Sequence, residues 1–186
     1  MSRLATHDEA TRSHCERVGR LSAAVGEELG LEPSRLATLR RAALLHDIGK
    51  LYVPERVLRK PGPLDELELE TMKRHSPAGH DLLVQAGLHA EAFYVLHHHE
   101  RLDGSGYPDG LRGEQIPLEC RVMLVADTFD AMISERPYRR AQPRAVAVAE
   151  LACVAGRELD ADCVVALLRA LNDETPVAGA CLVAAV

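Results

Sequence analysis

The apolar residues of this chain recur at the spacing of helix faces, and no stretch of note alternates at the period of a strand. One such face repeats every three or four residues and is formed by Val18, Leu21, Val25 and Leu29. His14 lies on the same face, one turn before Val18. Because the helical period extends over most of the chain, without repeats or low-complexity linkers, the sequence predicts one all-α domain, a helical bundle.

Capping and breaking residues divide this pattern into separate helices. Gly30 and Pro33 mark the end of one helix and the start of the next. Asp65 and Glu68 predict a capping box that opens a third helix, with His75 on its buried side.

Ser76 and Pro77 predict the N-cap and first residue of a further helical turn. Four glycines and two prolines make residues 101–117 a structured loop rather than a helix. The remaining helices are expected at about 89–100, from Pro117 onward, and near 143–155 and 160–171.

The 186 residues, 47% of them hydrophobic, suit one domain. We place this domain at residues 1–172 and leave the apolar tail, 173–186, without an assigned role.

A net charge of -6 argues against a broad basic face for duplex nucleic acid. Because the sequence shows no signal peptide and no run of 18 apolar residues, we expect a cytoplasmic protein without a membrane span.

The cysteines are five in number and form no CxxC pair. They are Cys15, Cys120, Cys153, Cys163 and Cys181. This pattern argues against a disulfide scaffold or a zinc knuckle. We therefore expect small, buried, apolar side chains in a reducing compartment.

Histidines and aspartates stand where predicted helices end or interrupt their apolar faces. They are His46 and Asp47 at one helix end, His75 and the run 97–99 at two others, and Asp127 and Asp130 within an apolar helix. Each would be costly to bury alone, whereas around a cation their nitrogens and oxygens become ligands. A single such His is more often a cap or a core residue, but recurrence in five segments favours a metal site.

The ligand types narrow the choice of metal. A set of His and Asp without thiolate argues against a structural zinc site. Carboxylates that can bridge suit a pair of divalent first-row ions, iron or manganese, and less often nickel or zinc. Two such ions would clamp a phosphodiester and share a hydroxide between them, with Asp47 as the natural bridge.

Four blocks of the sequence resemble the signatures of the HD-GYP family, within the HD superfamily of metal-dependent phosphohydrolases. Residues 46–50 read HDIGK, and residues 98–108 read HHERLDGSGYP, which is similar to the HHExxDGxGYP motif that names the family. Residues 126–131, ADTFDA, and 136–139, RPYR, resemble two further blocks. The similarity runs from about residue 14 to residue 171.

The resemblance implies an HD-type helical bundle with a Gly/Pro-rich GYP loop, and hydrolysis of cyclic di-GMP to pGpG and then often to GMP. It places Lys50 against the scissile phosphate or the bound water, beside Asp47. Tyr107, Arg136 and Arg139 would hold the substrate's phosphate or guanine, and arginine offers such groups a planar fork. The metal ligands that it implies are His14, His46, Asp47, His75, His98, His99 and Asp127.

Two positions depart from the family's pattern. Family members with a third metal usually carry a Glu four residues before the first His, and this chain has Ala10 there. Because alanine has no donor atom, we expect two ions rather than three, with pGpG accumulating. Leu102 also replaces a common Trp.

Two other functions stay open. One is an HD hydrolase of another nucleotide, although the GYP loop argues against a nucleoside monophosphate. The other is a catalytically weak module that responds to a cyclic dinucleotide and signals through partners; loss of metal ligands would be its mark, and the sequence retains them all. The protein partners that stay open are a second copy of this chain, in a homodimer, and signalling proteins.

Overall fold

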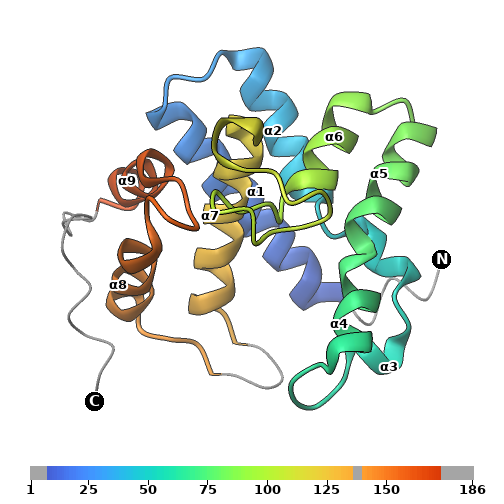
Figure 1. Ribbon diagram of the computed structural model, residues 1–186. Helices are drawn as coiled ribbons and strands as arrows, with labels where there is room; N and C mark the ends of the chain where they lie inside the picture. The colour runs from blue at the N-terminus through green and yellow to red at the C-terminus, as the bar shows by residue number, and fades with distance from the viewer. Residues whose placement is uncertain (1–7, 136–139, 173–186) are drawn as a thin grey trace.

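The computed structural model describes residues 8–135 and 140–172, and over these ranges the chain is a bundle of helices without a β-strand (Figure 1). The elements are α1 (Asp8–Glu28), α2 (Pro33–Leu45), η1 (Ile48–Tyr52), α3 (Glu55–Leu58), α4 (Glu66–Lys73), α5 (His75–Gln85), α6 (His89–His97), η2 (Gly113–Gln115), α7 (Leu118–Ile133), α8 (Arg144–Val154) and α9 (Ala161–Ala170). The all-α prediction is confirmed. The predicted tail, 173–186, and the RPYR block, 136–139, lie outside the described residues.

α1 is the helix against which α2, α7 and α9 pack. Val18 and Val25 of its predicted apolar face are fully buried, and Leu21 and Leu29 pack against the same core. Complete burial of such a side chain stabilises the fold by roughly 1.5–3 kcal/mol. The face expected from the spacing is therefore the one that holds α1 in the bundle, with His14 at its beginning.

The boundary between α4 and α5 differs from the prediction. The capping box is present, since the Glu68 amide donates to Asp65 Oδ1 at 2.9 Å. However, His75 is the first residue of α5 and not part of α4, so Ser76 and Pro77 are not an N-cap pair. Because the first four amides of a helix have no intrahelical partner, proline is tolerated throughout this turn, and its position does not fix the first residue.

Two other boundaries also differ. α6 ends at His97, three residues before the predicted end, and the connection expected after Lys50 contains the short helix α3. The loop at 101–117 contains only the 3₁₀ turn η2 and is otherwise irregular, as predicted.

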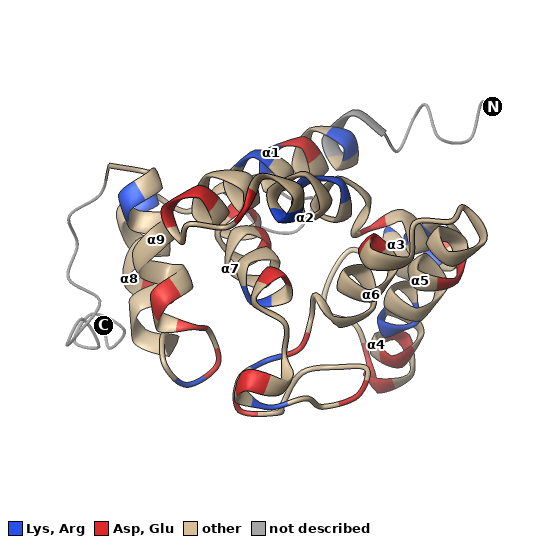
Figure 2. Cartoon of the chain, turned by 90° about the horizontal axis from the view of Figure 1, so that it is seen from above, with Lys and Arg blue, Asp and Glu red and all other residues tan. Residues whose placement is uncertain are grey.

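Charged residues of both signs occur together along the helices (Figure 2). Some of them tie elements together: Arg35 of α2 pairs with Glu119 of α7 at 2.8 Å, and Arg121 of α7 pairs with Asp160, the N-cap of α9, at 2.5 Å. None of the described helices combines the length and the hydropathy that crossing a bilayer requires.

At Gly49 the backbone of η1 lies in close contact with the start of α5. A Cβ added there would lie 1.9 Å from the carbonyl oxygen of His75 and 2.5 Å from the amide nitrogen of Gly79. No L side chain fits at such distances from backbone atoms. Glycine therefore lets the segment that carries Asp47 and Lys50 lie directly against the start of α5.

We expect Gly49→Ala to push η1 away from α5 and to lower the free energy of unfolding by about 1–3 kcal/mol. Urea denaturation followed by circular dichroism measures this change. Gly19→Ala is the matched control, since a Cβ there meets a Leu44 side-chain atom at 3.2 Å and alanine favours the helix. Equal stability of the Gly49 variant and the original chain would contradict the close packing.

Candidate metal centre

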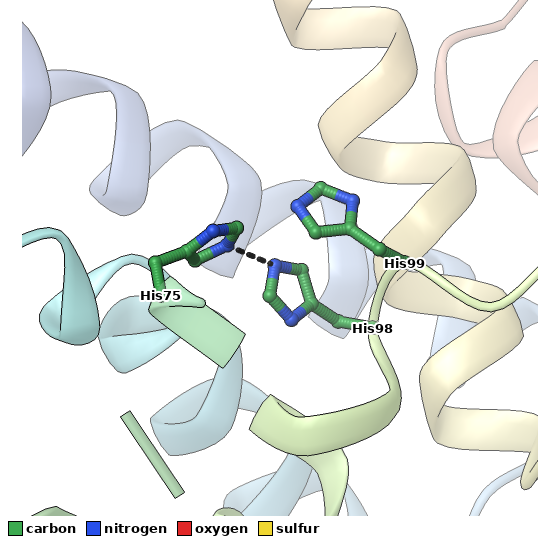
Figure 3. A group of neighbouring side chains, drawn as sticks. All are labelled: His75, His98 and His99. Carbon is green, nitrogen blue, oxygen red and sulfur yellow. Dashed lines mark hydrogen bonds between the residues drawn. The ribbon is translucent and has the colours of Figure 1, made fainter. Parts of the chain in front are cut away.

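The side chains expected to bind metal converge on one place from separate elements. His14 comes from α1, His46 and Asp47 from the junction of α2 and η1, His75 from the start of α5, His98 and His99 from the end of α6, and Asp127 from α7. Six of them form two groups, in each of which the ligand atoms lie within 4.8 Å of one another: His14, His46 and Asp127 in the first, and His75, His98 and His99 in the second. Figure 3 shows the imidazoles of the second group turned toward one another.

Asp47 lies between the two groups with one oxygen toward each. Its Oδ2 is 3.5 Å from His46 Nε2 and 3.9 Å from His14 Nε2, whereas its Oδ1 is 3.8 Å from His75 Nε2. The side chain is almost wholly buried, at 4% exposure. A carboxylate in this position can serve two ions at once, one through each oxygen.

Backbone carbonyls orient three of the imidazoles. Nδ1 of His46, His75 and His98 donates to the carbonyl oxygen three residues earlier, at 2.7, 2.8 and 2.7 Å. Since a carbonyl only accepts, each Nδ1 carries the proton and each Nε2 keeps its lone pair for a ligand. These histidines follow the last residues of helices, where carbonyls lack an intrahelical partner. A histidine at such a position can donate to a free carbonyl, and this explains why histidines recur at helix ends in this chain.

Asp130 holds the imidazole of His14, a role that the sequence did not indicate. It is fully buried, its Oδ2 accepts from His14 Nδ1 at 2.7 Å, and its Oδ1 accepts from Arg17 Nε at 2.6 Å. His14 Nε2 then lies 3.2 Å from Asp127 Oδ1. Burial lowers the pKa of His14, but hydrogen bonds to Asp127 and Asp130 raise it to about 9, so an ion at Nε2 must displace a proton.

The protonation states of the other ligands suit a cation. Burial lowers the pKa of His75, lowers that of His98 well below its ordinary value, and lowers that of His99 to about 3. Burial alone would raise the pKa of Asp47, yet the charge of Lys50 and the nearby imidazoles hold it well below the usual range. Neutral imidazoles and ionised carboxylates are the forms that bind divalent ions.

Two of the expected substrate contacts lie beside the ligands. Lys50 Nζ is 2.7 Å from Asp47 Oδ2, and its side chain is 34% exposed, so it reaches the solvent side of the site. The Tyr107 ring lies 4.8 Å from the His99 ring, and its amide donates to the His99 carbonyl at 3.3 Å. Burial raises the pKa of Tyr107, so its hydroxyl stays a donor. Arg136 and Arg139 lie outside the described residues.

Glu100 organises the GYP loop. From the sequence, this residue has no assigned role beyond its place in the HHExxDGxGYP motif. It is 1% exposed, and its Oε1 accepts from the amides of Asp109 and Gly110 at 2.7 and 3.1 Å. Its Oε2 accepts from the amide of Leu111 at 3.0 Å. A buried carboxylate thus gathers three successive backbone amides and fixes the loop beside the histidines.

The expectation that the cysteines are apolar core residues fits Cys120 and Cys163, which are buried. Cys15 lies beside the metal centre, because its sulfur and ligand atoms of His46 and Asp47 are within 4.8 Å of one another. Burial and the neighbouring Asp47 charge raise the pKa of the Cys15 thiol to about 12. The sequence places Cys15 next to His14 but cannot show which side chains it meets across the fold.

Known proteins are similar to this chain in sequence or in fold. The family model described as HD domain matches residues 1–163. The chain is 46% identical over 180 residues to the cyclic di-GMP phosphodiesterase response regulator RpfG of Xanthomonas campestris pv. campestris, covering 91% of this chain and 47% of that protein. It is 40% identical over 163 residues to 3'3'-cGAMP-specific phosphodiesterase 3 of Vibrio cholerae serotype O1, covering 87% and 35%. The chain thus spans half or less of the length of these relatives.

Among solved structures, Bd1817, an HDG"Y"P protein from Bdellovibrio bacteriovorus, superposes with a TM-score of 0.72. The match covers 87% of this chain and 52% of that one, at 22% sequence identity. At this identity the likeness concerns the fold, and it agrees with the helical architecture described above.

Proposed function

Because this chain belongs to the HD domain family, as its resemblance to HD-GYP proteins implied, we propose that it is a metal-dependent phosphodiesterase that hydrolyses cyclic di-GMP to pGpG. The observation that carries the proposal is Asp47, with Oδ2 directed at His46 and His14 and Oδ1 directed at His75. Relatives that are named as phosphodiesterases of cyclic dinucleotides support the substrate class.

The centre would hold two divalent ions, for which we propose iron or manganese. His14, His46 and Asp127 would bind one of them, His75, His98 and His99 the other, and Asp47 both. Bound there, the ions would activate water and neutralise charge on the oxygens of the phosphodiester. The Nε2 atoms of His46, His75 and His98, whose rings donate through Nδ1, and the ionised carboxylate of Asp47 fit this role.

The chain's own residues would bind and orient the substrate. The Lys50 ammonium, next to Asp47 and partly exposed, can donate to a non-bridging phosphate oxygen. The Tyr107 hydroxyl can donate to phosphate or guanine from its place above His99. Asp130 and Arg17 would keep His14 in place while the substrate is turned over.

The test is anaerobic purification with elemental analysis, followed by product analysis on cyclic di-GMP and, in parallel, 3'3'-cGAMP. We expect two ions per chain and pGpG as the accumulating product, because Ala10 offers no ligand for a third ion. Faster cleavage of 3'3'-cGAMP would favour the hydrolase of another cyclic dinucleotide, as in the Vibrio relative. A chain that holds two ions, binds cyclic di-GMP and cleaves neither substrate would be the interaction module instead.

We expect Tyr107→Phe and Arg139→Ala each to raise the KM for cyclic di-GMP by about tenfold, because each variant loses one hydrogen bond to a charged group. Neither variant should change the metal content. Steady-state kinetics and elemental analysis measure the two effects. Tyr52→Phe is the matched control, because Tyr52 of η1 is 67% exposed. Wild-type KM values in both variants would show that the family's substrate contacts do not apply here.

A further inference from the structure

We propose that Lys73 binds the second phosphate of the cyclic dinucleotide, the one that is not cleaved, and thereby selects cyclic dinucleotides over substrates with a single phosphate. The proposal rests on the proposed function and adds a subsite to it. Lys73 is the last residue of α4 and lies outside the four blocks of sequence that resemble the HD-GYP signatures.

The ammonium of Lys73 stands at the edge of the candidate metal centre. Its Nζ lies over the ring of Tyr107, 5.7 Å from the ring centroid. That ring in turn lies 4.8 Å from the ring of His99 and 6.4 Å from the ring of His75. Attraction between a cation and an aromatic face favours this position of the ammonium. A positive charge therefore stands beside the aromatic side chain that adjoins the imidazoles of the second group.

The contacts of Lys73 within the protein leave donors for a ligand. Glu70 Oε1 accepts from Nζ at 2.5 Å, and 64% of the Glu70 side chain is exposed. An exposed pair of this kind contributes little to stability. Because an ammonium has three N–H donors, Lys73 can keep this bond and still donate to a phosphate oxygen. Its side chain is 32% exposed, so a ligand can reach it.

Lys50 and Lys73 would then each bind one of the two phosphates. Lys50 Nζ is 2.7 Å from the carboxylate of Asp47, which places it at the phosphate that the ions would hold. The hydroxyl of Tyr107 faces the same place, since burial and then the charges of Asp127 and Asp47 raise its pKa. Lys73 instead lies over the ring itself.

The shape of the substrate requires a second cation of this kind. A cyclic dinucleotide carries its two phosphodiesters on opposite sides of one macrocycle. When one phosphodiester lies between the ions, the other lies away from them and keeps its negative charge. Hydrogen bonds from an ammonium to a charged oxygen are stronger than those between neutral groups, so Lys73 would add affinity for a substrate that has this second charge.

Substrates with one and with two phosphates test this on the full, metal-loaded chain. We expect Lys73→Ala to raise the KM for cyclic di-GMP by on the order of tenfold, through the loss of one hydrogen bond between charged groups. The KM for bis(p-nitrophenyl) phosphate, which has a single phosphodiester, should not change. Lys73→Arg should retain most of the affinity, because the charge remains. Lys60→Ala is the matched control, since Lys60 has the same 32% side-chain exposure and also pairs with a glutamate of α4.

Calorimetric titration gives a measurement that does not depend on turnover. The product pGpG retains the second phosphate, whereas GMP does not. The Lys73→Ala chain should therefore bind pGpG about tenfold more weakly than the original chain, and GMP equally well.

Each outcome supports or overturns the subsite. Unchanged values for cyclic di-GMP and pGpG in Lys73→Ala would overturn it and leave the proposed function standing. Equal losses with bis(p-nitrophenyl) phosphate and cyclic di-GMP would also overturn it, because Lys73 would then act only by positioning Tyr107. An original chain that cleaves bis(p-nitrophenyl) phosphate but no cyclic dinucleotide would overturn the proposed function together with the inference.

Discussion

Asp47→Asn is expected to lose both ions and with them the hydrolysis of cyclic di-GMP. The amide has the shape of the carboxylate but only one oxygen and no charge, so it cannot face His46 with one ligand oxygen and His75 with another. Losing a group that hydrogen-bonds to a metal ligand lowers metal affinity or activity by roughly 10–100-fold. Losing a carboxylate that is itself a ligand of both ions should lower them by more. Elemental analysis and turnover of the same preparation measure the effect.

The companion and control variants make this result specific. His99→Ala should also strip metal and abolish turnover, because it removes one of the three imidazoles of the second group. Asp81→Asn on α5, whose side chain is 72% exposed, should keep both ions and full activity. Two ions and normal turnover in both Asp47→Asn and His99→Ala would refute the two-metal proposal.

The features that the sequence could predict are those with a local cause. Val18 and Val25 are buried because their spacing sets one face of α1, and the Asp65 capping box opens α4 by contacts within four residues. His46 and His98 follow helices α2 and α6 as expected, since a carbonyl one turn back orients each ring. At Pro77 the local signal was ambiguous, because proline is tolerated at several positions of a first helical turn, and the predicted start of α5 was therefore wrong.

The roles that the sequence could not supply depend on contacts between distant segments. Asp130 meets His14 across 116 positions of sequence, and whether its side chain faces α1 or solvent depends on how α1 and α7 cross. The neighbours of Cys15 likewise lie on another element. Asp130 did carry a signal: it stands three residues after Asp127, on the same side of α7, where a second carboxylate among apolar residues requires a partner.

The GYP loop combines both situations. Its glycines and prolines predict an irregular segment, but they do not say what holds that segment in one conformation. In the structure, the buried carboxylate of Glu100 holds the loop in its conformation by accepting from the amides of three successive residues. The loop is therefore attached to the segment of His98 and His99, and the position of Tyr107 depends on that attachment.

Glu100→Ala is accordingly expected to lower the free energy of unfolding by about 2–4 kcal/mol and to reduce kcat/KM more than Tyr107→Phe does. Three amides lose their acceptor in the interior, since Glu100 is only 1% exposed. Each unsatisfied amide costs about 1–3 kcal/mol unless the loop opens to water. Opening would carry Tyr107 away from His99. Urea denaturation and kinetics measure the two changes.

Glu100→Gln should fall between the original chain and the alanine variant, because one amide oxygen can still accept from Asp109 and Gly110, whereas its NH₂ group opposes the amide of Leu111. Glu114→Ala, at an exposed position of the same loop, is the matched control and should change neither stability nor kinetics. If Glu100→Ala kept wild-type stability and kcat/KM, the loop would have to be held by its glycines and prolines alone. Tyr107 would then take its position without help from the carboxylate.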